Sequence, residues 1–533
     1  MKFLNVLAYN FLAASLTNGA TVRHNSIAFD KSPQAVRLSF DKHQARSFEE
    51  VLEGKSGLQK RDGDDVSFDL KNELNFYSVA LQIGTPGQEV TVLLDTGSSD
   101  FWVPSSENPY CKSSSQSGNG TQQEQNQVQE KAQQTLTGGR TATTAGTSQT
   151  SATLNCSQYG TFSCNKSSTF RSNNTGFSVA YGDGSYASGT WGTDVVAVGG
   201  INMTGVSIGV ANVTNSSVGI LGIGLEALEN TYTGVQNVKN GDTREYANFP
   251  MVLKSEGFID KNVYSLYLNS KDSPQGSILF GAVDHSKYSG QLYTVPILNL
   301  YKKKGLKDPL QLQVTLQGVG VQENNNTNTT TTTPVPALLD SGTTLVYLPD
   351  EMASLLAEQI GAQWDERIQY YISDCSNLDD AQLFYNFGGF NIASNLSSYI
   401  VGHTGQHCVL GIQPSGGDSA ILGDMFMEHA YVVFDLERFE ISLAQARYDS
   451  GQEQVEVVTK KVPSAKKAPG YSSTYSTSQS ILPTGNIFTI SGSSVSGSSS
   501  TSMRTKSGDN VAADLAPAPL LALFVHFMLS FLL

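Results

Sequence analysis

The stretch that decides the fold is Val92–Ser99, which reads VLLDTGSS. An aliphatic run ends in a carboxylate, and small glycine and hydroxyl residues follow at once. This pattern predicts a buried strand that ends in a tight loop. The unit occurs again at Ala337–Thr344, which reads ALLDSGTT. One copy would be weak evidence because short strings of this kind arise by chance, whereas two copies, each ending an apolar strand, favour a shared role.

The two aspartates of these motifs, Asp95 and Asp340, suit an acid–base role. Two carboxyl groups held face to face cannot both ionise cheaply, so they share a proton and titrate as a pair. The ionised member can then take a proton from water, while the protonated member donates to a substrate carbonyl oxygen. The alternative is structural, because each aspartate could merely close a turn. The matched pair favours the catalytic interpretation.

The residues after each aspartate supply short hydrogen-bond donors. We expect the amides of Gly97 and Gly342 and the hydroxyls of Ser98 and Thr343 to hold the outer carboxylate oxygens. Glycine is needed there because the backbone must come close without a Cβ atom in the way. These four residues are therefore predicted to support the aspartate pair.

The motifs, with those that follow them, resemble the signatures of pepsin-like aspartic proteases. The supporting stretches are FWVP at Phe101–Pro104, YGDGS at Tyr181–Ser185, GILGIG at Gly219–Gly224 and AILGD at Ala420–Asp424. The resemblance covers roughly residues 76–446, and the two ends of the chain narrow it to the membrane-anchored yapsin branch of yeasts. It implies an all-β, bilobal fold with a cleft between two related lobes, residues 62–245 and 246–449. It also implies an endopeptidase without cofactor or metal, and the chain has no H-E-x-x-H zinc motif.

Residues 177–186 are predicted to form a hairpin with a glycine-rich tip. By resemblance this is the flap that closes over a bound peptide, with Tyr181 packing on the substrate near Trp102 and the glycines permitting movement. Asp183 lies at the tip. Relatives with an acid there tend to accept Lys or Arg before the scissile bond, and a desolvated carboxylate facing a basic side chain explains this preference. A solvated turn aspartate is the alternative.

Length and charge narrow the function classes. The chain has 533 residues, enough for two or more domains, and a net charge of −14. No basic patch dominates, so nucleic acid is not expected as a partner. The acidity suits an acidic extracellular setting or basic substrates, although a simple gain in solubility explains it equally well.

The five cysteines, together with the signal peptide described next, predict an oxidising compartment. Cys375 and Cys408 fall alone in the second half, so we expect them to pair. In the first half Cys111 can pair with either Cys156 or Cys164. The resemblance to yapsins favours Cys111–Cys156, with Cys164 left over.

Two segments precede the first lobe. Residues 1–20 combine a lysine, an apolar core and small residues, which predicts a secretory signal peptide. Residues 21–61 are rich in Lys and Arg and end in the dibasic pair Lys60–Arg61. By resemblance they form a propeptide whose basic residues cover the acidic cleft until it is cut off after that pair. A leader with an incidental dibasic pair is the alternative.

Two polar stretches are predicted to lack regular structure. Residues 112–155 are low in complexity and cannot bury enough apolar surface to fold, so a Cys111–Cys156 bond would close a long insertion at its base. Yapsins carry a comparable insertion that can be cut. Only the isolated Lys131 and Arg140 lie in this one, which leaves cutting into two chains open. Residues 322–334, rich in Asn and Thr, are predicted as a surface loop.

The C-terminal end suggests a surface anchor. Residues 450–510 form a Ser/Thr-rich stalk that begins with a short lysine patch, and residues 511–533 end in an apolar tail typical of a GPI signal. Asn510 is the favoured attachment site, with Gly508 and Asp509 as rivals. A membrane-spanning helix is the alternative, but the tail falls short of the roughly 20 apolar residues needed.

Sequons for N-glycosylation predict a secreted glycoprotein. They are Asn119, Asn155, Asn165, Asn173, Asn202, Asn212, Asn215, Asn325, Asn328 and Asn395.

Together these features predict an aspartic endopeptidase of the yeast cell surface, anchored to the plasma membrane or held in the cell wall. It would cut proteins and propeptides at mono- or dibasic sites, using water activated by Asp95 and Asp340. Its partners would be peptide substrates and the membrane, and it would be a monomer or a disulfide-linked two-chain form. The rival is a cell-wall glycoprotein that binds peptides without cutting them, which the stalk and anchor would also suit.

Overall fold

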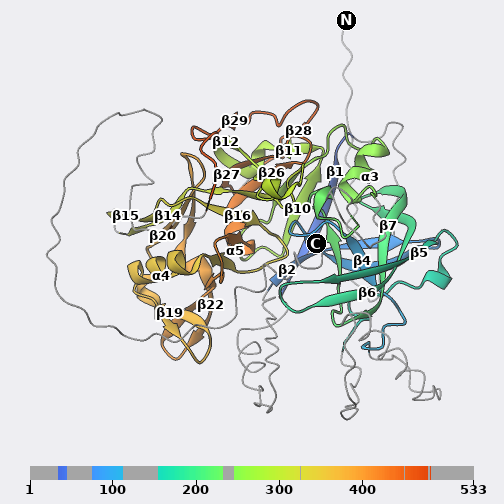
Figure 1. The fold of residues 1–533 in the computed structure, drawn as a ribbon, viewed down its shortest axis with the longest axis horizontal. Coiled ribbons are helices and arrows are strands. Elements are labelled where there is room, and N and C mark those ends of the chain that lie inside the picture. The colour runs from blue at the N-terminus through green and yellow to red at the C-terminus, as the bar shows by residue number, and fades with distance from the viewer. Residues whose placement is uncertain are drawn as a thin grey trace, which may run out of the picture.

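A computed structural model describes residues 34–44, 75–111, 154–231, 245–323, 326–448, 451–477 and 480–481. Within these ranges the protein is built almost entirely of strands joined by short helical turns (Figure 1). The strands of the first half are β1 (Val36–Gln44), β2 (Asn75–Ile83), β3 (Gln88–Asp95), β4 (Phe101–Pro104), β5 (Arg171–Ala180), β6 (Tyr186–Val198), β7 (Ile201–Thr214) and β8 (Gly219–Gly222).

The second half contains many short strands. They are β9 (Val263–Tyr267), β10 (Gln275–Phe280), β11 (Ala282–Asp284), β12 (Tyr288–Pro296), β13 (Gln313–Leu316), β14 (Gly318–Glu323), β15 (Asn326–Thr331), β16 (Val335–Leu339), β17 (Val346–Leu348), β18 (Gln363–Asp365), β19 (Tyr370–Asp374), β20 (Gln382–Asn386), β21 (Asn391–Asn395), β22 (Ile400–Thr404), β23 (His407–Leu410), β24 (Ile412–Pro414), β25 (Ala420–Leu422), β26 (Ala430–Asp435), β27 (Glu440–Ala446), β28 (Val455–Val457) and β29 (Lys466–Lys467).

The helices are few and short. The α-helices are α3 (Phe249–Ser255), α4 (Asp350–Gln359) and α5 (Asp424–Met427), and the 3₁₀ turns are η1 (Cys164–Lys166), η2 (Glu226–Leu228), η3 (His285–Lys287), η4 (Lys302–Lys304), η5 (Cys375–Asn377) and η6 (Leu396–Tyr399). In the part of the chain that the structure describes, no helix combines the length and the apolar character needed to cross a bilayer.

One large sheet connects the two halves of the molecule. Its order is β29-β12-β27-β26-β9-β10-β1-β2-β3-β8-β4-β7-β6-β5, so β1 joins the strands of the first half to those of the second. Figure 1 shows the blue-to-green first half and the yellow-to-orange second half on opposite sides of the molecule. The all-β, two-lobed architecture predicted from the sequence is therefore confirmed.

The duplicated motif corresponds to a duplicated strand arrangement. In the first lobe β3 pairs in parallel with β8, which pairs antiparallel with β4. In the second lobe β16 pairs in parallel with β25, which pairs antiparallel with β17. The strands β3 and β16 read as continuous aliphatic runs because their side chains are buried on both faces. Each run therefore delivers its aspartate to the end of a rigid, buried strand.

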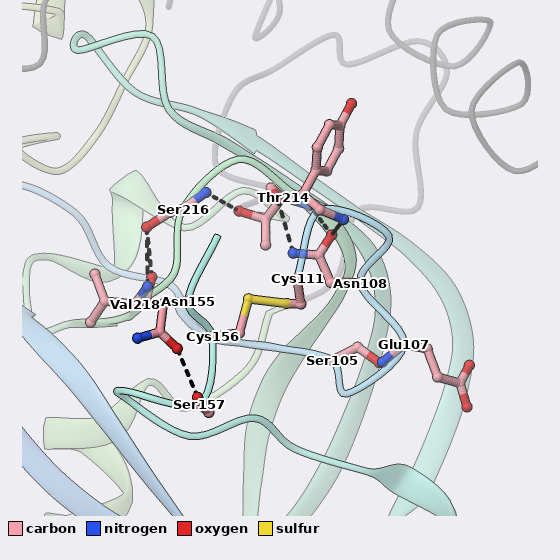
Figure 2. The surroundings of a disulfide bond; sticks show 11 residues. Ser105, Glu107, Asn108, Cys111, Asn155, Cys156, Ser157, Thr214, Ser216 and Val218 are labelled. Carbon is pink, nitrogen blue, oxygen red and sulfur yellow. Dashed lines mark hydrogen bonds between the residues drawn. A yellow bond between two sulfur atoms is a disulfide. The ribbon is translucent and has the colours of Figure 1, made fainter. Parts of the chain in front are cut away.

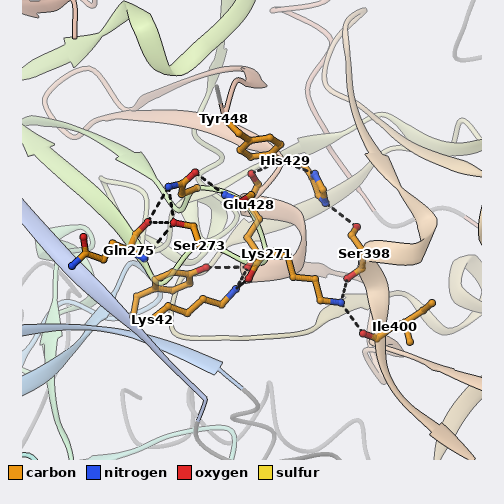
Figure 3. Close-up of polar contacts among 12 residues, drawn as sticks. Lys42, Lys271, Ser273, Gln275, Ser398, Ile400, Glu428, His429 and Tyr448 are labelled. Carbon is orange, nitrogen blue, oxygen red and sulfur yellow. Dashed lines mark hydrogen bonds and ion pairs between the residues drawn. The ribbon is translucent and has the colours of Figure 1, made fainter. Parts of the chain in front are cut away.

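Strand β1 lies inside the segment predicted as a propeptide. It pairs antiparallel with β10 on one side and with β2 on the other, and Val36, Leu38 and Phe40 are buried in the main core. Lys42, at its end, forms a buried ion pair with Glu428 (Figure 3). The described part of this segment is therefore built into the centre of the sheet.

Two boundaries differ from the sequence prediction. Residues 326–331, expected in a surface loop, form strand β15, which pairs with β14 and buries Thr330 and Thr331. Residues 451–477, expected in the stalk, pack on the second lobe through β28 and β29, with Val458 buried. The reason is the same in both places, because a polar segment that pairs with a sheet edge satisfies its backbone and needs only a few buried side chains.

The structure contains both predicted disulfides, Cys111–Cys156 and Cys375–Cys408, and Cys164 is free. Figure 2 shows the first of them beside the hydrogen bonds that link Asn108 to Thr214. Other predicted features lie outside the described residues. They are residues 1–20, the Lys60–Arg61 pair, residues 112–153, the sequons Asn119 and Asn325, the tail after residue 481 and its attachment site Asn510.

Candidate active site

The loop after each strand holds its aspartate in the same way. Gly97 N donates to Asp95 Oδ1 over 2.7 Å, and the Ser98 hydroxyl donates to Oδ2. In the second loop, the equivalent donors to Asp340 are the Gly342 amide at 2.9 Å and the Thr343 hydroxyl at 2.7 Å. All four predicted supporting residues therefore lie where the sequence analysis expected them.

The two loops are also bonded directly to each other through the hydroxyl residue that follows each aspartate. Thr96 Oγ1 donates to Leu339 O and accepts from Ser341 N, at 2.8 and 2.9 Å. Ser341 Oγ in turn donates to Leu94 O and accepts from Thr96 N, at 2.8 and 3.1 Å. Sequence reasoning missed this reciprocal link, although a hydroxyl directly after both aspartates was the available signal.

This link brings the two carboxyl groups together. A Cβ atom added to Gly97 would lie 2.5 Å from Asp340 Oδ1, and one added to Gly342 would lie 2.5 Å from Asp95 Oδ1. Each glycine thus packs against the opposite aspartate, which explains why neither position tolerates a side chain. The aspartates themselves are 5% and 9% exposed. We call Asp95 and Asp340 the dyad.

The environment of the dyad favours retention of a proton. Burial, followed by the charge of Asp340, raises the pKa of Asp95 well above its usual range. The hydrogen bonds from Ser98 and Gly97 lower that pKa in part, because they stabilise the ionised form. The balance is a carboxyl pair that keeps one proton under acidic conditions while its other member can ionise.

The β5–β6 hairpin is the segment that the sequence analysis predicted as a flap. Trp102 Nε1 donates to the Tyr181 hydroxyl over 2.7 Å, which joins the hairpin tip to the floor of the first lobe. Burial, followed by the charge of Asp95, raises the pKa of Tyr181, so this ring lies within electrostatic reach of the dyad. Asp183 Oδ1 accepts from the amide and hydroxyl of Ser185, at 2.8 and 2.6 Å. Asp183 thus stabilises the turn, as the structural alternative predicted.

A family model described as eukaryotic aspartyl protease matches residues 76–446. The chain belongs to the pepsin-like aspartyl protease family. It is therefore an aspartic endopeptidase, a hydrolase of peptide bonds.

Relatives in Saccharomyces cerevisiae place it near the yapsins. It is 45% identical to Aspartic proteinase 3, with 94% of each chain covered. It is 46% identical to Aspartic proteinase MKC7 over 88% of this chain and 82% of the relative, and 44% identical to Aspartic proteinase yapsin-3 over 81% and 78%. The crystal structure of the aspartic proteinase from Irpex lacteus has a TM-score of 0.52 at 19% identity, covering 78% of this chain and 98% of that one, and this likeness supports the fold alone.

Behind each dyad loop of this aspartyl protease lies a second pair of buried carboxyl groups, which sequence reasoning missed. Asp100 and Glu229 form the first-lobe pair, and Asp424 and Glu428 form the second-lobe pair. All four are at most 4% exposed. Asp100 and Glu229 are far apart in the sequence and meet only in the folded chain, whereas Asp424 and Glu428 lie four residues apart at α5.

One group of potential metal ligands gathers among the described residues. It consists of Cys375, His403 and Cys408. Both cysteines are joined in a disulfide, so neither offers the thiolate that a metal site requires.

Proposed function

We propose that this protease cleaves peptides with a water molecule activated between Asp95 and Asp340. The observation that carries the proposal is the convergence of two buried carboxyl groups, each held by its own loop and each packed against the opposite glycine. The rival, a peptide-binding protein without activity, is not favoured because both loops keep every predicted donor.

The proposed reaction moves protons without a covalent intermediate. The ionised carboxylate takes a proton from water as the water oxygen attacks the peptide carbonyl carbon, and the protonated carboxyl donates to the carbonyl oxygen. When the carbon–nitrogen bond breaks, the leaving nitrogen takes a proton from the protonated carboxyl, and the ionised carboxylate takes a proton from a hydroxyl of the tetrahedral diol as the new carboxyl group forms. The pair returns to its singly protonated state, which the raised pKa of Asp95 favours under acidic conditions.

The experiment is cleavage of a Lys-Arg peptide between pH 3 and 6 by wild type and by Asp95→Asn. We expect activity that a pepstatin-type inhibitor blocks and that falls by roughly 10²–10⁴-fold or more in the variant, the range for loss of an acid–base group. A folded wild-type protein that cuts no peptide across this range would refute the proposal.

Preference for basic sites is the finer part of the proposed function. Asp183 uses Oδ1 for the turn, and Oδ2 makes no hydrogen bond to the residues that the structure describes. This second oxygen could face a Lys or Arg side chain of the substrate across a desolvated gap. Asp183→Asn keeps the turn acceptor and removes the charge, so cleavage-site profiling should show a weaker Lys/Arg preference with unchanged stability. A profile without Lys or Arg enrichment in the wild type would refute it.

The proposed setting is the secretory pathway and the cell surface, supported by the predicted signal peptide and GPI signal and by the disulfides. The proposed propeptide, residues 21–61, includes β1. Its Arg37 lies 3.6 Å from Asp284 and 3.2 Å from Glu453, and Lys42 pairs with Glu428. These contacts support a propeptide held by charges in the sheet. Terminal sequencing of the secreted protein and release by a phospholipase that cuts GPI anchors test these assignments.

A further inference from the structure

Glu229 has an unusual environment for a carboxyl group. It follows η2 directly and is 1% exposed. Neither of its carboxylate oxygens has a hydrogen-bond partner of regular geometry among the described residues. A buried charge without a partner is so unfavourable that the group keeps its proton instead. Glu229 is therefore held as a neutral acid inside the first lobe.

Its neighbour Asp100 is tied to the flap. Asp100 is 4% exposed and accepts the backbone amide of Asn230 through both oxygens, at 3.0 and 3.3 Å, and the hydroxyl of Tyr246. The side chain of the same Asn230 donates to Ser178 O on β5 over 2.7 Å. A continuous chain of bonds thus runs from the dyad loop through Asp100 and Asn230 to the first strand of the flap.

The groups that act on Glu229 are almost all acidic. They are the carboxyl groups of Asp100, Glu226 and Glu245, together with the backbone amide of Tyr246. Burial first, and Asp100 second, raise the pKa of Glu229 to about 10, and only the Tyr246 amide lowers it. The charge of Asp100 also contributes to the raised pKa of Tyr181. No ion pair joins Glu229 to a cation among the described residues, so ionisation of both carboxyl groups would place two buried negative charges near each other.

We propose that Glu229 is a positioning residue, which keeps the flap in place through Asp100 and Asn230 only while this carboxyl pair holds a proton. When the pH rises and the pair loses that proton, repulsion separates residues 226–231 from Asp100. The bond from Asn230 to Ser178 is then lost and the flap is no longer held over the dyad. The inference rests on the proposed role of the β5–β6 hairpin as a flap, and it adds a control on that flap from outside the dyad.

The first test is the pH profile of kcat/KM for Glu229→Gln. The amide has the shape of the protonated acid but cannot ionise, so the fall of activity on the alkaline side should move to higher pH. Activity at pH 4 should stay within about twofold. Glu351→Gln is the matched control, because Glu351 is exposed on α4, and its profile should match the wild type. An unshifted alkaline limb in folded Glu229→Gln would overturn the proposal.

A second variant tests the hydrogen bond between Asn230 and Ser178 separately from the protonation of the carboxyl pair. Asn230→Ala removes the bond to Ser178 and keeps the backbone amide that Asp100 accepts. We expect KM to rise at every pH while the position of the alkaline limb is unchanged. A variant with wild-type KM would show that this bond does not hold the flap, and would overturn the proposal.

A third measurement needs neither a variant nor catalysis. In the wild type, hydrogen-exchange protection of β5 and of residues 226–231, corrected for intrinsic rates, should fall over the pH range in which activity falls. Constant protection would overturn the proposal even if Glu229→Gln failed to fold. Protection that falls while activity persists would fault the flap assignment of the proposed function and leave the carboxyl pair intact.

Discussion

The two buried carboxyl pairs behind the dyad differ in how their charge is compensated. In the second lobe Glu428 accepts from Lys42 (Figure 3). It also accepts from the Tyr77 hydroxyl over 3.1 Å. In the first lobe Glu229 forms no ion pair with the described residues, and the neutral donors Asn230 N and the Tyr246 hydroxyl bind Asp100. Related lobes thus contain one buried carboxyl pair with a lysine beside it and one whose Glu229 has no ion-pair partner among the described residues.

This difference shows that the two lobes respond to different signals. The second-lobe pair depends on β1, the strand from the proposed propeptide, because that strand carries its lysine. The first-lobe pair depends on pH, because a proton takes the place of the lysine. If β1 is removed when the chain is processed, the second-lobe pair loses its lysine, whereas Glu229 in the first lobe has no ion pair to lose among the described residues.

The largest expected effect comes from removing the cation. Lys42→Met in the uncleaved chain leaves Glu428 buried without its charged partner, and breaking a buried ion pair in this way costs about 3–5 kcal/mol. Denaturant unfolding at pH 6 measures the loss. The double variant Lys42→Met with Glu428→Gln should regain most of it, because Tyr77 can still donate to the amide oxygen.

The exposed ion pair of Arg367 with Asp365 is the control for burial. Arg367 has 79% of its side chain exposed, so Arg367→Gln should leave the unfolding midpoint unchanged. A loss of stability in this variant as large as in Lys42→Met would mean that burial does not determine how much the Lys42–Glu428 ion pair contributes to the unfolding free energy.

The next effect concerns the link between the loops, which joins the lobes in a symmetric way. Thr96→Val and Ser341→Ala each remove one hydroxyl and leave a buried amide and carbonyl without partners, at a cost of about 1–3 kcal/mol each. The double variant should cost less than the sum, because the two hydroxyls belong to one network. Additive losses would show that the two bonds act independently.

These residues also indicate how far the sequence could predict the site. The dyad and its four supporting donors were predicted because the motif is local and repeated. The link between Thr96 and Ser341 and the pairing of Asp100 with Glu229 were not, because each joins segments that meet only after folding. The pair of Asp424 and Glu428 is local, but its burial depends on the surrounding fold. The boundaries at 326–331 and 451–477 were missed because isolated apolar residues such as Val458 are buried by pairing with sheet edges, which composition does not reveal.

The last expected effect is a change in how steeply the unfolding free energy depends on pH, and it distinguishes the two carboxyl pairs. Burial, then the charge of Glu428, raises the pKa of Asp424, so the folded chain keeps a proton that the unfolded chain releases. Stability must then fall as the pH rises above the unfolded pKa, by at most about 1.4 kcal/mol per pH unit for one group. Asp424→Asn and Glu229→Gln should both flatten that fall.

The two variants should differ in how they depend on Lys42. Lys42 lowers the pKa of Asp424 in part, whereas the carboxyl groups around Glu229 raise its pKa. Denaturant unfolding between pH 5 and 8 should therefore show a flatter fall of the unfolding free energy in both variants, and only the effect of Asp424→Asn should depend on residue 42. If Lys42 causes this asymmetry, Lys42→Met must enlarge the effect of Asp424→Asn and leave that of Glu229→Gln unchanged. If both variants flatten the pH dependence equally, with and without Lys42→Met, then Lys42 does not affect the protonation of Asp424.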